Sequence, residues 1–441
     1  AVVGGGIAGL STAYFLARAG IHVELFEASA ELGGLARSFE YRGQRNDLYY
    51  HFFCLPDAEI LELARELGFD GGFCWKPART TFYYEGRLYP FTSGKDLLAF
   101  DAIPLAARIN MGLRALAWGR DQDWRDLDEV PAHVWLKQRL GQRAYDVVWS
   151  PLLTMKFGKY RDQISAAWIW HRVHRVAASR QGATRAQVMG YIRGGMQTLL
   201  DSVRQGILDH GGRIHLRAPV KGIIARETGG LRGLRVRGRP RRFDAAVMAV
   251  PLPQLTPMLP ASLGEYRADL ARVSFLGVAC LVVHLRCSVT DSFWCNINDS
   301  RIPYSGLIET TALNPDAGSG DTLVYVPHYL AVDHPRFRYT DATFRQEFVR
   351  VLSMIRPGMG EDDVRAFRVF RSPYAQAVCP PGFGKEVPTT ETPMRGLYLI
   401  DSTQLYPSDR TVSGTIGQSR RVADQVQGYL GAVGADQGSR S

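Results

Sequence analysis

The sequence lacks the features that mark disulfide-rich, metal-binding and membrane-spanning proteins. Its six cysteines form no C-x-x-C pair and have no spacing to histidine that suits zinc. We therefore expect no disulfide framework and no metal site, and predict a cytoplasmic chain whose cysteines are reduced. The longest apolar run, about Phe275 to Leu285, is far shorter than the roughly 18 to 20 residues of a membrane-spanning helix. Internal repeats and low-complexity segments are absent too.

Lysine is also scarce. Only seven of the 53 basic residues are lysines, so the net charge of +10 rests on arginine. A genome that favours arginine codons explains this most simply, and a pocket that grips phosphate or carboxylate is the alternative. The densest basic stretch, LRGLRVRGRPRRF, lies between two expected strands without interleaved aromatic residues. Nucleic-acid binding is therefore not expected.

The clearest motif stands at the beginning of the chain. Residues 1–3 form the end of an apolar strand, residues 4–9 read GGGIAG and fit G-x-G-x-x-G, and the next ten residues have helical apolar spacing. In such a turn Gly4 lets the chain reverse, Gly6 lets the backbone approach a pyrophosphate, and Gly9 lets the helix pack on the strand. The helix N-terminus offers N–H groups to the anion. We predict a dinucleotide site rather than a purely structural turn.

The next segment selects the nucleotide. A second strand, residues 21–26, ends in Glu27, whose carboxylate can accept both hydroxyls of an adenosine ribose, so NAD or FAD is favoured over NADP. In the following ELGGLARSF, Gly33 and Gly34 supply a second bare stretch of backbone, and Arg37 supplies a cation. A long dinucleotide needs both for its second phosphate and ribityl chain. The predicted cofactor is FAD.

The glycine pair resembles the signature of a flavoprotein superfamily that includes amine oxidases, protoporphyrinogen oxidases, carotenoid desaturases and UDP-galactopyranose mutases. The closing GLYLIDSTQLYPSDRTVSGTIGQS is similar to the last flavin segment of that superfamily. The resemblance implies an α/β fold, α+β overall, in which a Rossmann-type FAD-binding domain of the glutathione-reductase-like kind is interleaved with a substrate domain of mixed sheet and helices. The expected FAD domain is residues 1–75, 190–260 and 376–441, and the expected substrate domain is residues 76–189 and 261–375.

The resemblance also implies which residues hold FAD. Val220 is expected at the adenine and Asp401 at the ribityl hydroxyls. Thr411 and Val412 lead the final helix, whose N-terminus would stabilise negative charge on the flavin N1/O2 edge. The expected FAD site is Gly4, Gly6, Ile7, Ala8, Gly9, Glu27, Ala28, Gly33, Gly34, Leu35, Ala36, Arg37, Tyr50, His51, Phe52, Val220, Asp401, Asp409, Thr411 and Val412.

Two kinds of relative imply different chemistry. Protoporphyrinogen oxidases, amine oxidases and desaturases take a hydride from an organic substrate, whereas the mutases use reduced flavin on a nucleotide sugar without net oxidation. The segments YYHFF, LLTMKFGKY, WIWHRVHR and RIPYSGLIE resemble mutase segments, although Tyr49 replaces the expected glycine. Sequences with the D-x-Y-Y-H-F-F stretch are generally described as resembling protoporphyrinogen oxidase. We predict an FAD-dependent oxidoreductase, with the mutase as the alternative and a non-enzymatic flavin module as a further one.

The predicted catalytic residues are His51, Arg172 and Arg175. A neutral imidazole at the flavin can relay a proton, although a core histidine is the plainer interpretation. Arg172, His174 and Arg175 lie within one helical turn and form an anion clamp if that helix faces the cleft; a solvated charged face is the plainer interpretation. No lysine lies between Lys221 and Lys385, which disfavours amine oxidases proper, because they usually place a lysine near flavin N5 there.

The remaining expectations concern the substrate and the partners. A small-molecule substrate is expected, with Tyr325, His328, Tyr329 and Tyr374 as pocket walls. Residues 96–118 read as an amphipathic, basic helix, which suits a membrane surface or packing against the core, and core packing is favoured. The chain begins without methionine inside an expected strand, so we expect residues upstream of Ala1. The sequence indicates no particular oligomeric state.

Overall fold

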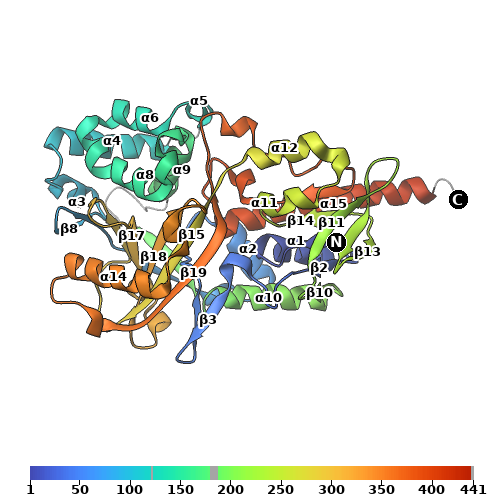
Figure 1. Cartoon of the computed structure of the whole chain (residues 1–441), viewed down its shortest axis with the longest axis horizontal. Coiled ribbons are helices and arrows are strands. Elements are labelled where there is room, and N and C mark those ends of the chain that lie inside the picture. The colour runs from blue at the N-terminus through green and yellow to red at the C-terminus, as the bar shows by residue number, and fades with distance from the viewer. Residues whose placement is uncertain (121–122, 179–186, 439–441) are drawn as a thin grey trace.

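A computed structural model describes residues 1–120, 123–178 and 187–438, and in them two sheets of different construction lie toward opposite ends of the long axis (Figure 1). The sheet on the right of Figure 1 is wholly parallel and has the order β10-β2-β1-β14-β20. Its strands are β10 (Arg213–His215), β2 (Glu24–Phe26), β1 (Val2–Val3), β14 (Ala246–Met248) and β20 (Leu397–Leu399). The expected α/β architecture is confirmed.

Helices from distant parts of the chain cover the parallel sheet. Helix α1 (Ile7–Arg18) packs against both α10 (Met196–Asp209) and α15 (Val412–Gly438). All residues of β1, β2, β14 and β20 are buried, as expected for parallel strands with both faces covered. These strands fall within the three segments expected for the FAD domain, while the domain limits themselves stay a prediction.

The sheet on the left of Figure 1 is antiparallel except where β16 runs parallel to β7. In spatial order its strands are β19 (Val364–Ala377), β15 (Phe275–Leu285), β18 (Thr322–Leu330), β17 (Gly306–Glu309), β16 (Trp294–Ile297), β7 (Thr80–Tyr84) and β8 (Arg87–Pro90). Helix α14 (Asp341–Ile355) covers one face, where Phe344 and Phe348 share a core with Val324 and Val326 of β18. Alternate residues of β18 belong to the opposite face.

A helical layer lies above this second sheet in Figure 1. It consists of α3 (Gly94–Ala99), α4 (Leu105–Arg120), α5 (Arg125–Asp128), α6 (Ala132–Leu140), α7 (Gln142–Ala144), α8 (Ser150–Phe157) and α9 (Ala166–Ala178). Trp118 of α4 packs against Trp135 of α6, with ring centroids 4.3 Å apart. Helix α8 contacts β18, so the helical layer packs against the sheet there.

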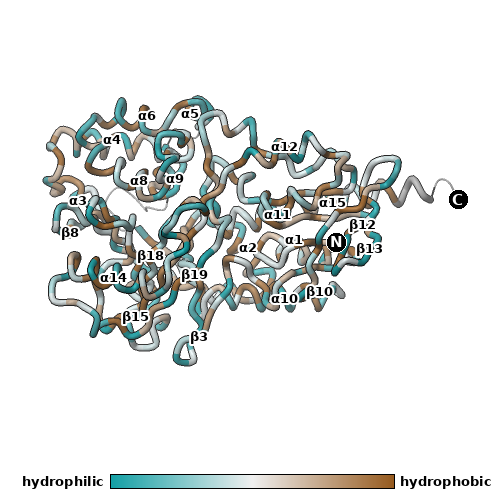
Figure 2. Tube along the Cα trace, viewed as in Figure 1, coloured by the Kyte–Doolittle hydropathy of each residue, from teal (hydrophilic) through white to brown (hydrophobic). Residues whose placement is uncertain are grey.

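The remaining strands and α-helices are short. The short strands are β3 (Ser38–Tyr41), β4 (Gln44–Asp47), β5 (Phe53–Cys54), β6 (Phe73–Pro77), β9 (Val188–Ile192), β11 (Val220–Ala225), β12 (Leu231–Val236) and β13 (Arg239–Arg242). The short helices are α2 (Ala58–Glu66), α11 (Leu252–Leu255), α12 (Gly264–Arg272) and α13 (Thr310–Leu313). Figure 2 shows the apolar stretches in the strands of both sheets and in α1. Within the described ranges no helix is both long and apolar enough to cross a bilayer.

Candidate functional site

The glycine turn between β1 and α1 is tight on one side and open on the other. A Cβ placed on Gly9 would lie 1.8 Å from the carbonyl oxygen of Gly4, so the helix can pack this close to the strand only with glycine there. A Cβ placed on Gly6 would meet no protein atom within 4 Å. The backbone of Gly6 therefore faces space that a phosphate can fill, at the N-terminus of α1. This arrangement fits the pyrophosphate of a dinucleotide.

The second glycine pair lies directly beside the first. The Gly33 N–H donates to the Gly5 carbonyl at 2.7 Å, and Gly33 and Gly6 form a parallel bridge. Gly33 has φ of +114°, a conformation that favours glycine. Arg37 Nε donates to the Gly34 carbonyl at 3.2 Å while its side chain stays 39% exposed. Two stretches of bare backbone and one available guanidinium thus share one surface.

Glu27 ends β2 with a fixed carboxylate. Its Oε2 accepts from the Gly5 N–H at 2.6 Å and its Oε1 from the Ser29 N–H at 2.7 Å. Each oxygen retains a second lone pair, so the carboxylate can still accept two ribose hydroxyls. The Ala218 N–H donates to the Glu27 carbonyl at 2.8 Å, which brings the beginning of β11 and the buried Val220 alongside. Ala28, between Glu27 and Ser29, follows the same turn.

His51 is held by a carboxylate that is itself held from several sides. Its Nδ1 lies 3.2 Å from Oδ2 of Asp47. The Met196 N–H donates to Asp47 Oδ1 at 3.1 Å, and the Tyr325 hydroxyl donates to the Asp47 carbonyl at 2.6 Å. A carboxylate partner makes Nδ1 the donor, which leaves Nε2 of His51 as an acceptor. Tyr325 therefore holds the backbone of Asp47, the residue whose carboxylate contacts His51.

The neighbouring aromatic residues form a wall. Tyr50 lies edge-on to Trp294 and Tyr325, with centroids 5.5 and 6.5 Å apart, and burial raises the pKa of Tyr50 well above its ordinary value. Phe52 lies under the Arg175 guanidinium, 5.8 Å from the ring centroid. Tyr50, His51 and Phe52 are thus fixed in place, and their contact with flavin stays a prediction.

Four charged side chains from three segments meet near this wall. Arg172 of α9 binds Asp409, with Nη1 and Oδ2 2.8 Å apart. Burial opposes ionisation of Asp409, yet Lys156, Arg172 and Arg410 hold its pKa well below the usual range. Arg410 donates from Nη2 to the Tyr329 hydroxyl at 3.0 Å. The cluster therefore carries more cationic than anionic groups.

Lys156 of α8 and Arg410 are the members of this cluster that the sequence did not predict. Lys156 is the more deeply surrounded by aromatic rings. Its Nζ lies 4.4 Å from the ring centroid of Trp168 and 5.1 Å from that of Tyr329. Burial, together with the Arg172 and Arg410 cations, lowers the pKa of Lys156 to about 7 against the pull of Asp409. The LLTMKFGKY segment contained the signal, and Arg410 stands between two residues that we did select.

Arg172 and Arg175, the arginines of the predicted anion clamp, are each paired with a carboxylate in this structure. Both lie within one turn of α9, but Arg175 binds Asp57, with Nη2 3.0 and 3.3 Å from its two carboxylate oxygens, while Arg172 binds Asp409. Each guanidinium is therefore paired with a carboxylate from a different loop. Two free forks are not presented to one anion, because the tertiary fold brings a separate acid to each.

The four predicted pocket walls are divided between two faces of the sheet. Tyr325 and Tyr329 of β18 face Tyr50 and Lys156, but His328 lies on the α14 side, where its ring packs edge-on to Tyr304 with centroids 5.5 Å apart. Burial lowers the pKa of His328 to about 3. Tyr374, on β19, packs against Phe275 with centroids 6.2 Å apart.

At the C-terminal flavin segment the predicted residues act on local backbone. Asp401 caps a short 3-10 helix at Ser402–Leu405, since its oxygens accept from the Thr403 N–H at 2.8 Å and the Leu252 N–H at 3.3 Å. Burial raises the pKa of Asp401. Thr411 Oγ1 accepts from the Gly414 N–H at 2.9 Å, just where α15 begins at Val412. Contact of Asp401 with the ribityl chain stays a prediction.

Three buried polar atoms without a hydrogen-bond partner line one narrow cavity beside the charged cluster. They are Gln376 Oε1, Thr403 Oγ1 and Arg410 Nη1, and Trp168 and Cys379 complete the wall. Buried polar groups in folded proteins are nearly always paired, and a cavity of about 10 Å³ has room for one ordered water molecule to pair with them. A separate cavity of about 440 Å³, between Val387–Glu391 and α15, contains none of the predicted site residues.

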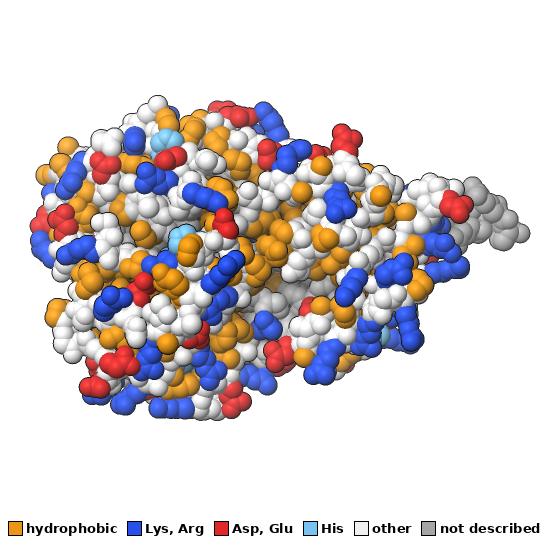
Figure 3. Space-filling model, viewed as in Figure 1, with side chains coloured by type: hydrophobic (Ala, Val, Ile, Leu, Met, Phe, Trp, Pro, Cys, Tyr) orange, Lys and Arg blue, Asp and Glu red, His pale blue; other side chains and the backbone are white. Residues whose placement is uncertain are grey.

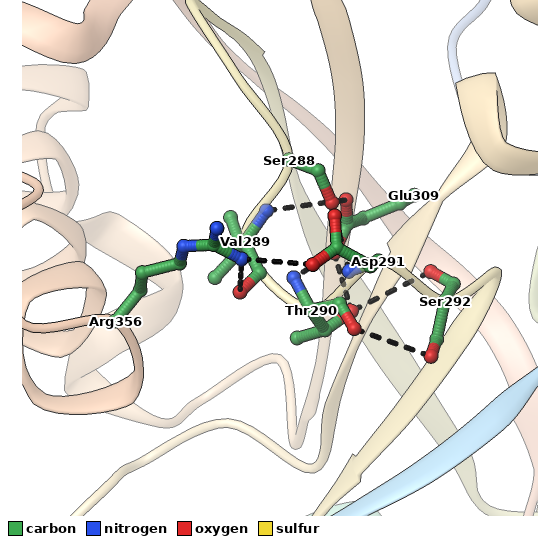
Figure 4. A network of polar contacts seen from close by, with 7 residues as sticks. All are labelled: Ser288, Val289, Thr290, Asp291, Ser292, Glu309 and Arg356. Atoms are coloured by element: carbon green, nitrogen blue, oxygen red, sulfur yellow. Dashed lines mark hydrogen bonds and ion pairs between the residues drawn. The ribbon is translucent and has the colours of Figure 1, made fainter.

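The mutase-like RIPYSGLIE segment has a structural role. Glu309 at its end accepts from Ser288 Oγ at 2.6 Å and from the N–H groups of Val289 and Thr290 at 3.2 and 2.6 Å (Figure 4). Burial raises the pKa of Glu309. Its carboxylate fastens the loop after β15 to β17. Within the described residues no group of three or more His, Cys, Asp or Glu side chains is placed to hold a metal ion.

Parts of this chain are similar to curated proteins, among them a coproporphyrinogen III oxidase and a zeta-carotene desaturase. A coproporphyrinogen III oxidase of Mycobacterium tuberculosis is 29% identical over 286 residues, which are 58% of this chain and 59% of that protein. A zeta-carotene desaturase of Zea mays is 25% identical over 318 residues, which are 65% of this chain and 55% of that protein. The chain thus spans less than two thirds of the length of these curated relatives.

Solved structures share the fold. A reduced UDP-galactopyranose mutase has a TM-score of 0.74 at 14% identity, with 97% of this chain and 95% of that chain covered. Cyclohexylamine oxidase from Brevibacterium oxydans IH-35A has a TM-score of 0.72 at 17% identity, with 97% and 98% covered. An oxidoreductase from Methanosarcina mazei has a TM-score of 0.73 at 16% identity, with 96% and 99% covered.

The family profile described as flavin containing amine oxidoreductase matches residues 7–427, which is nearly the whole chain. It includes the glycine turn after Gly6, Glu27, the charged cluster and the beginning of α15. The chain belongs to the flavin-containing amine oxidoreductase family, which implies a flavin cofactor.

Proposed function

We propose that the flavin is FAD and that it is held by the two glycine segments, Glu27 and Arg37. One observation carries this proposal. A Cβ on Gly6 would meet no protein atom within 4 Å, so the space in front of Gly6 is open. The backbone of Gly33 and the fixed carboxylate of Glu27 both lie beside this open space. A mononucleotide would leave the ribose acceptor unused. A visible absorption spectrum of the purified protein, with mass spectrometry of the released flavin, tests this, and release of FMN or of no flavin after incubation with FAD contradicts it.

Glu27→Ala is expected to weaken FAD binding by about 2 to 3 kcal/mol, or roughly 30- to 150-fold. The substitution removes the acceptor for the ribose and leaves the N–H groups of Gly5 and Ser29 without their side-chain partner. Glu27→Gln keeps one carbonyl oxygen, so its affinity for FAD should lie between those of wild type and Glu27→Ala. Titration of the apoprotein with FAD measures the loss. Unchanged affinity in Glu27→Ala would place the adenosine elsewhere.

We propose that the reaction is the removal of a hydride from an organic substrate bound between the FAD domain (residues 1–75, 190–260 and 376–441) and the substrate domain (residues 76–189 and 261–375). When bound, the flavin supplies a two-electron acceptor for that hydride, and oxygen or another acceptor takes the electrons onward. The aromatic wall around Tyr50 supports an organic substrate and excludes water from the reacting bond.

The chain contributes the proton transfer. Lys156 has a pKa near 7, and its amine lies among the Trp168 and Tyr329 rings, so the neutral form can take the proton that leaves the substrate with the hydride. His51 is the second candidate, with Nε2 free to accept. Burial, with the charges of Arg172 and Arg410, lowers the pKa of Lys156, and the same two arginines help to lower the pKa of Asp409.

A redox-neutral reaction on a nucleotide sugar is the alternative. The pairing of Arg172 with Asp409 and of Arg175 with Asp57 speaks against it, because it leaves no pair of free forks for a diphosphate. The measurement is acceptor consumption per product, with candidate tetrapyrroles, polyenes and amines and with a nucleotide-sugar panel, before and after dithionite reduction. Turnover that requires prior reduction and consumes no acceptor would overturn the hydride proposal.

A further inference from the structure

Helix α4 turns an apolar face to the outside of the molecule. Leu105, Ile109, Leu113 and Leu116 are 54%, 47%, 62% and 51% exposed, and Leu98 of the adjoining α3 is 48% exposed. Spacings of four, four and three place the α4 residues on one side of the helix. We call these five residues the outer apolar face. A surface helix normally shows polar residues there, so the face is suited to contact with another apolar surface.

The inward side of α4 is apolar as well and is already in use. Met111 and Trp118 are each 8% exposed and belong to the core, and α4 packs against α6 and α9. Core packing, the interpretation that the sequence favoured, accounts for Met111 and Trp118 but not for the four exposed residues of α4. The outer apolar face has no covering element among the described residues.

Basic side chains outnumber acidic ones on α3 and α4, and the one acid on these two helices is Asp96 of α3. Helix α4 contains Arg108, Arg114 and Arg120 and no acidic residue, and Lys95 lies exposed on α3. Arg108 donates to the Leu98 carbonyl and so ties α3 to α4. Basic and apolar side chains lie next to one another over α3 and α4 at the left of the molecule, with some acidic side chains among them (Figure 3). Exposed leucine and isoleucine can enter the apolar part of a bilayer surface, while nearby arginine and lysine can bind its anionic headgroups.

We infer that the outer apolar face docks on an anionic membrane surface, with Leu105, Ile109, Leu113 and Leu116 in the interface and the basic residues against lipid headgroups. A second copy of the chain fits this face less well. A two-fold axis through the outer apolar face would bring the arginines of one helix near those of the other, and like charges at an interface are unfavourable.

The docked orientation has a consequence for the candidate site. Helix α9, on which α4 packs, supplies Trp168 and Arg172 to the charged cluster. One helix layer therefore separates the outer apolar face from the site. A membrane-dissolved, apolar substrate then starts its path close to the flavin. This consequence rests on the proposed function, whereas membrane docking itself does not.

The test is flotation of the flavin-loaded protein with vesicles. Wild type should float with vesicles of equal parts phosphatidylcholine and phosphatidylglycerol, and less with phosphatidylcholine alone. The double variant Leu113→Gln/Leu116→Gln should bind about tenfold less, since two buried leucines are lost from the interface. Leu208→Gln/Leu216→Gln, which alters two leucines that are 39% and 38% exposed on α10 and just after β10, is the control and should bind as wild type does.

Several outcomes overturn the inference. Wild type that stays in the unbound fraction does so, and so does equal flotation of both double variants with the anionic vesicles. Sedimentation in the absence of vesicles tests whether a second copy occupies the face. If the protein does not float but forms a dimer, and Leu113→Gln/Leu116→Gln dissociates that dimer, the face belongs to a second copy. Circular dichroism and flavin content of each variant show that the fold is retained. None of these readouts depends on the reaction, so failure here and failure of the hydride proposal are distinguishable.

Discussion

Gly6→Ala is expected to leave the fold of the apoprotein unchanged and to weaken flavin binding about a thousandfold, which corresponds to roughly 4 kcal/mol. The backbone of Gly6 has φ of −75° and ψ of −179°, a conformation that alanine adopts freely. A Cβ at this position meets no protein atom within 4 Å. The added methyl group therefore occupies only the space through which a phosphate must approach the N-terminus of α1.

Gly9→Ala is the matched comparison, because it adds the same methyl group one helical turn away. Its Cβ would stand 1.8 Å from the Gly4 carbonyl oxygen, so β1 and α1 must separate, with an expected loss of about 3 kcal/mol or more in the free energy of unfolding. Thermal unfolding of the two apoproteins and their titration with flavin separate the effects. Wild-type affinity in Gly6→Ala, or equal destabilisation by both substitutions, would contradict the assignment of the open side to a phosphate.

The parts of the site that the sequence predicts are those made by one short segment. The turn at Gly4–Gly9, the carboxylate of Glu27 and the pair at Gly33 lie within about thirty residues, and their geometry follows from the strand–turn–helix pattern. A local motif carries its own structural context. For this reason the sequence alone brings these three features together, while their contact with a nucleotide stays a prediction.

The charged cluster could not be predicted in the same way. Lys156, Arg172, Asp409 and Arg410 come from α8, α9 and the segment before α15, and only tertiary packing brings them together. The sequence indicates that Arg172 and Arg175 are neighbours on a helix, but not that Asp57 lies beside one of them. Pairing across a fold depends on contacts between segments far apart in the chain.

Strand β18 shows a second reason. Its residues from Leu323 to Leu330 are all buried, because one face meets α14 and the other meets the site. A strand that is buried on both faces has no polar and apolar alternation to indicate which side chains point where. A difference of one position therefore decides that Tyr329 lies at Lys156 while His328 lies at Tyr304. Helix α4 poses the same difficulty, since both of its sides are apolar.

Lys156→Met is expected to lower the maximal rate about a hundredfold or more and to remove the pH dependence that Lys156 imposes. Because the neutral amine is the proton acceptor and its pKa is about 7, the wild-type rate should rise with pH through about 7 and level off above it. Lys159→Met is the matched control, since Lys159 lies three residues further on, largely exposed, with Nζ 3.5 Å from Asp333. It should keep the wild-type profile.

Stability gives a readout for Lys156 that does not require turnover. In the unfolded chain this lysine titrates at its ordinary value of 10.5, whereas in the fold it has already lost its proton above about 7. Between these two values the unfolded state binds the additional proton, so the free energy of unfolding should rise as the pH rises from about 7 to 10.5. Lys156→Met lacks this contribution, and its advantage in stability over wild type should shrink across the same window. If the variant kept the wild-type rate profile while its stability changed in this way, Lys156 would be a buried amine without a part in the reaction, and the free Nε2 of His51 would be the proton acceptor.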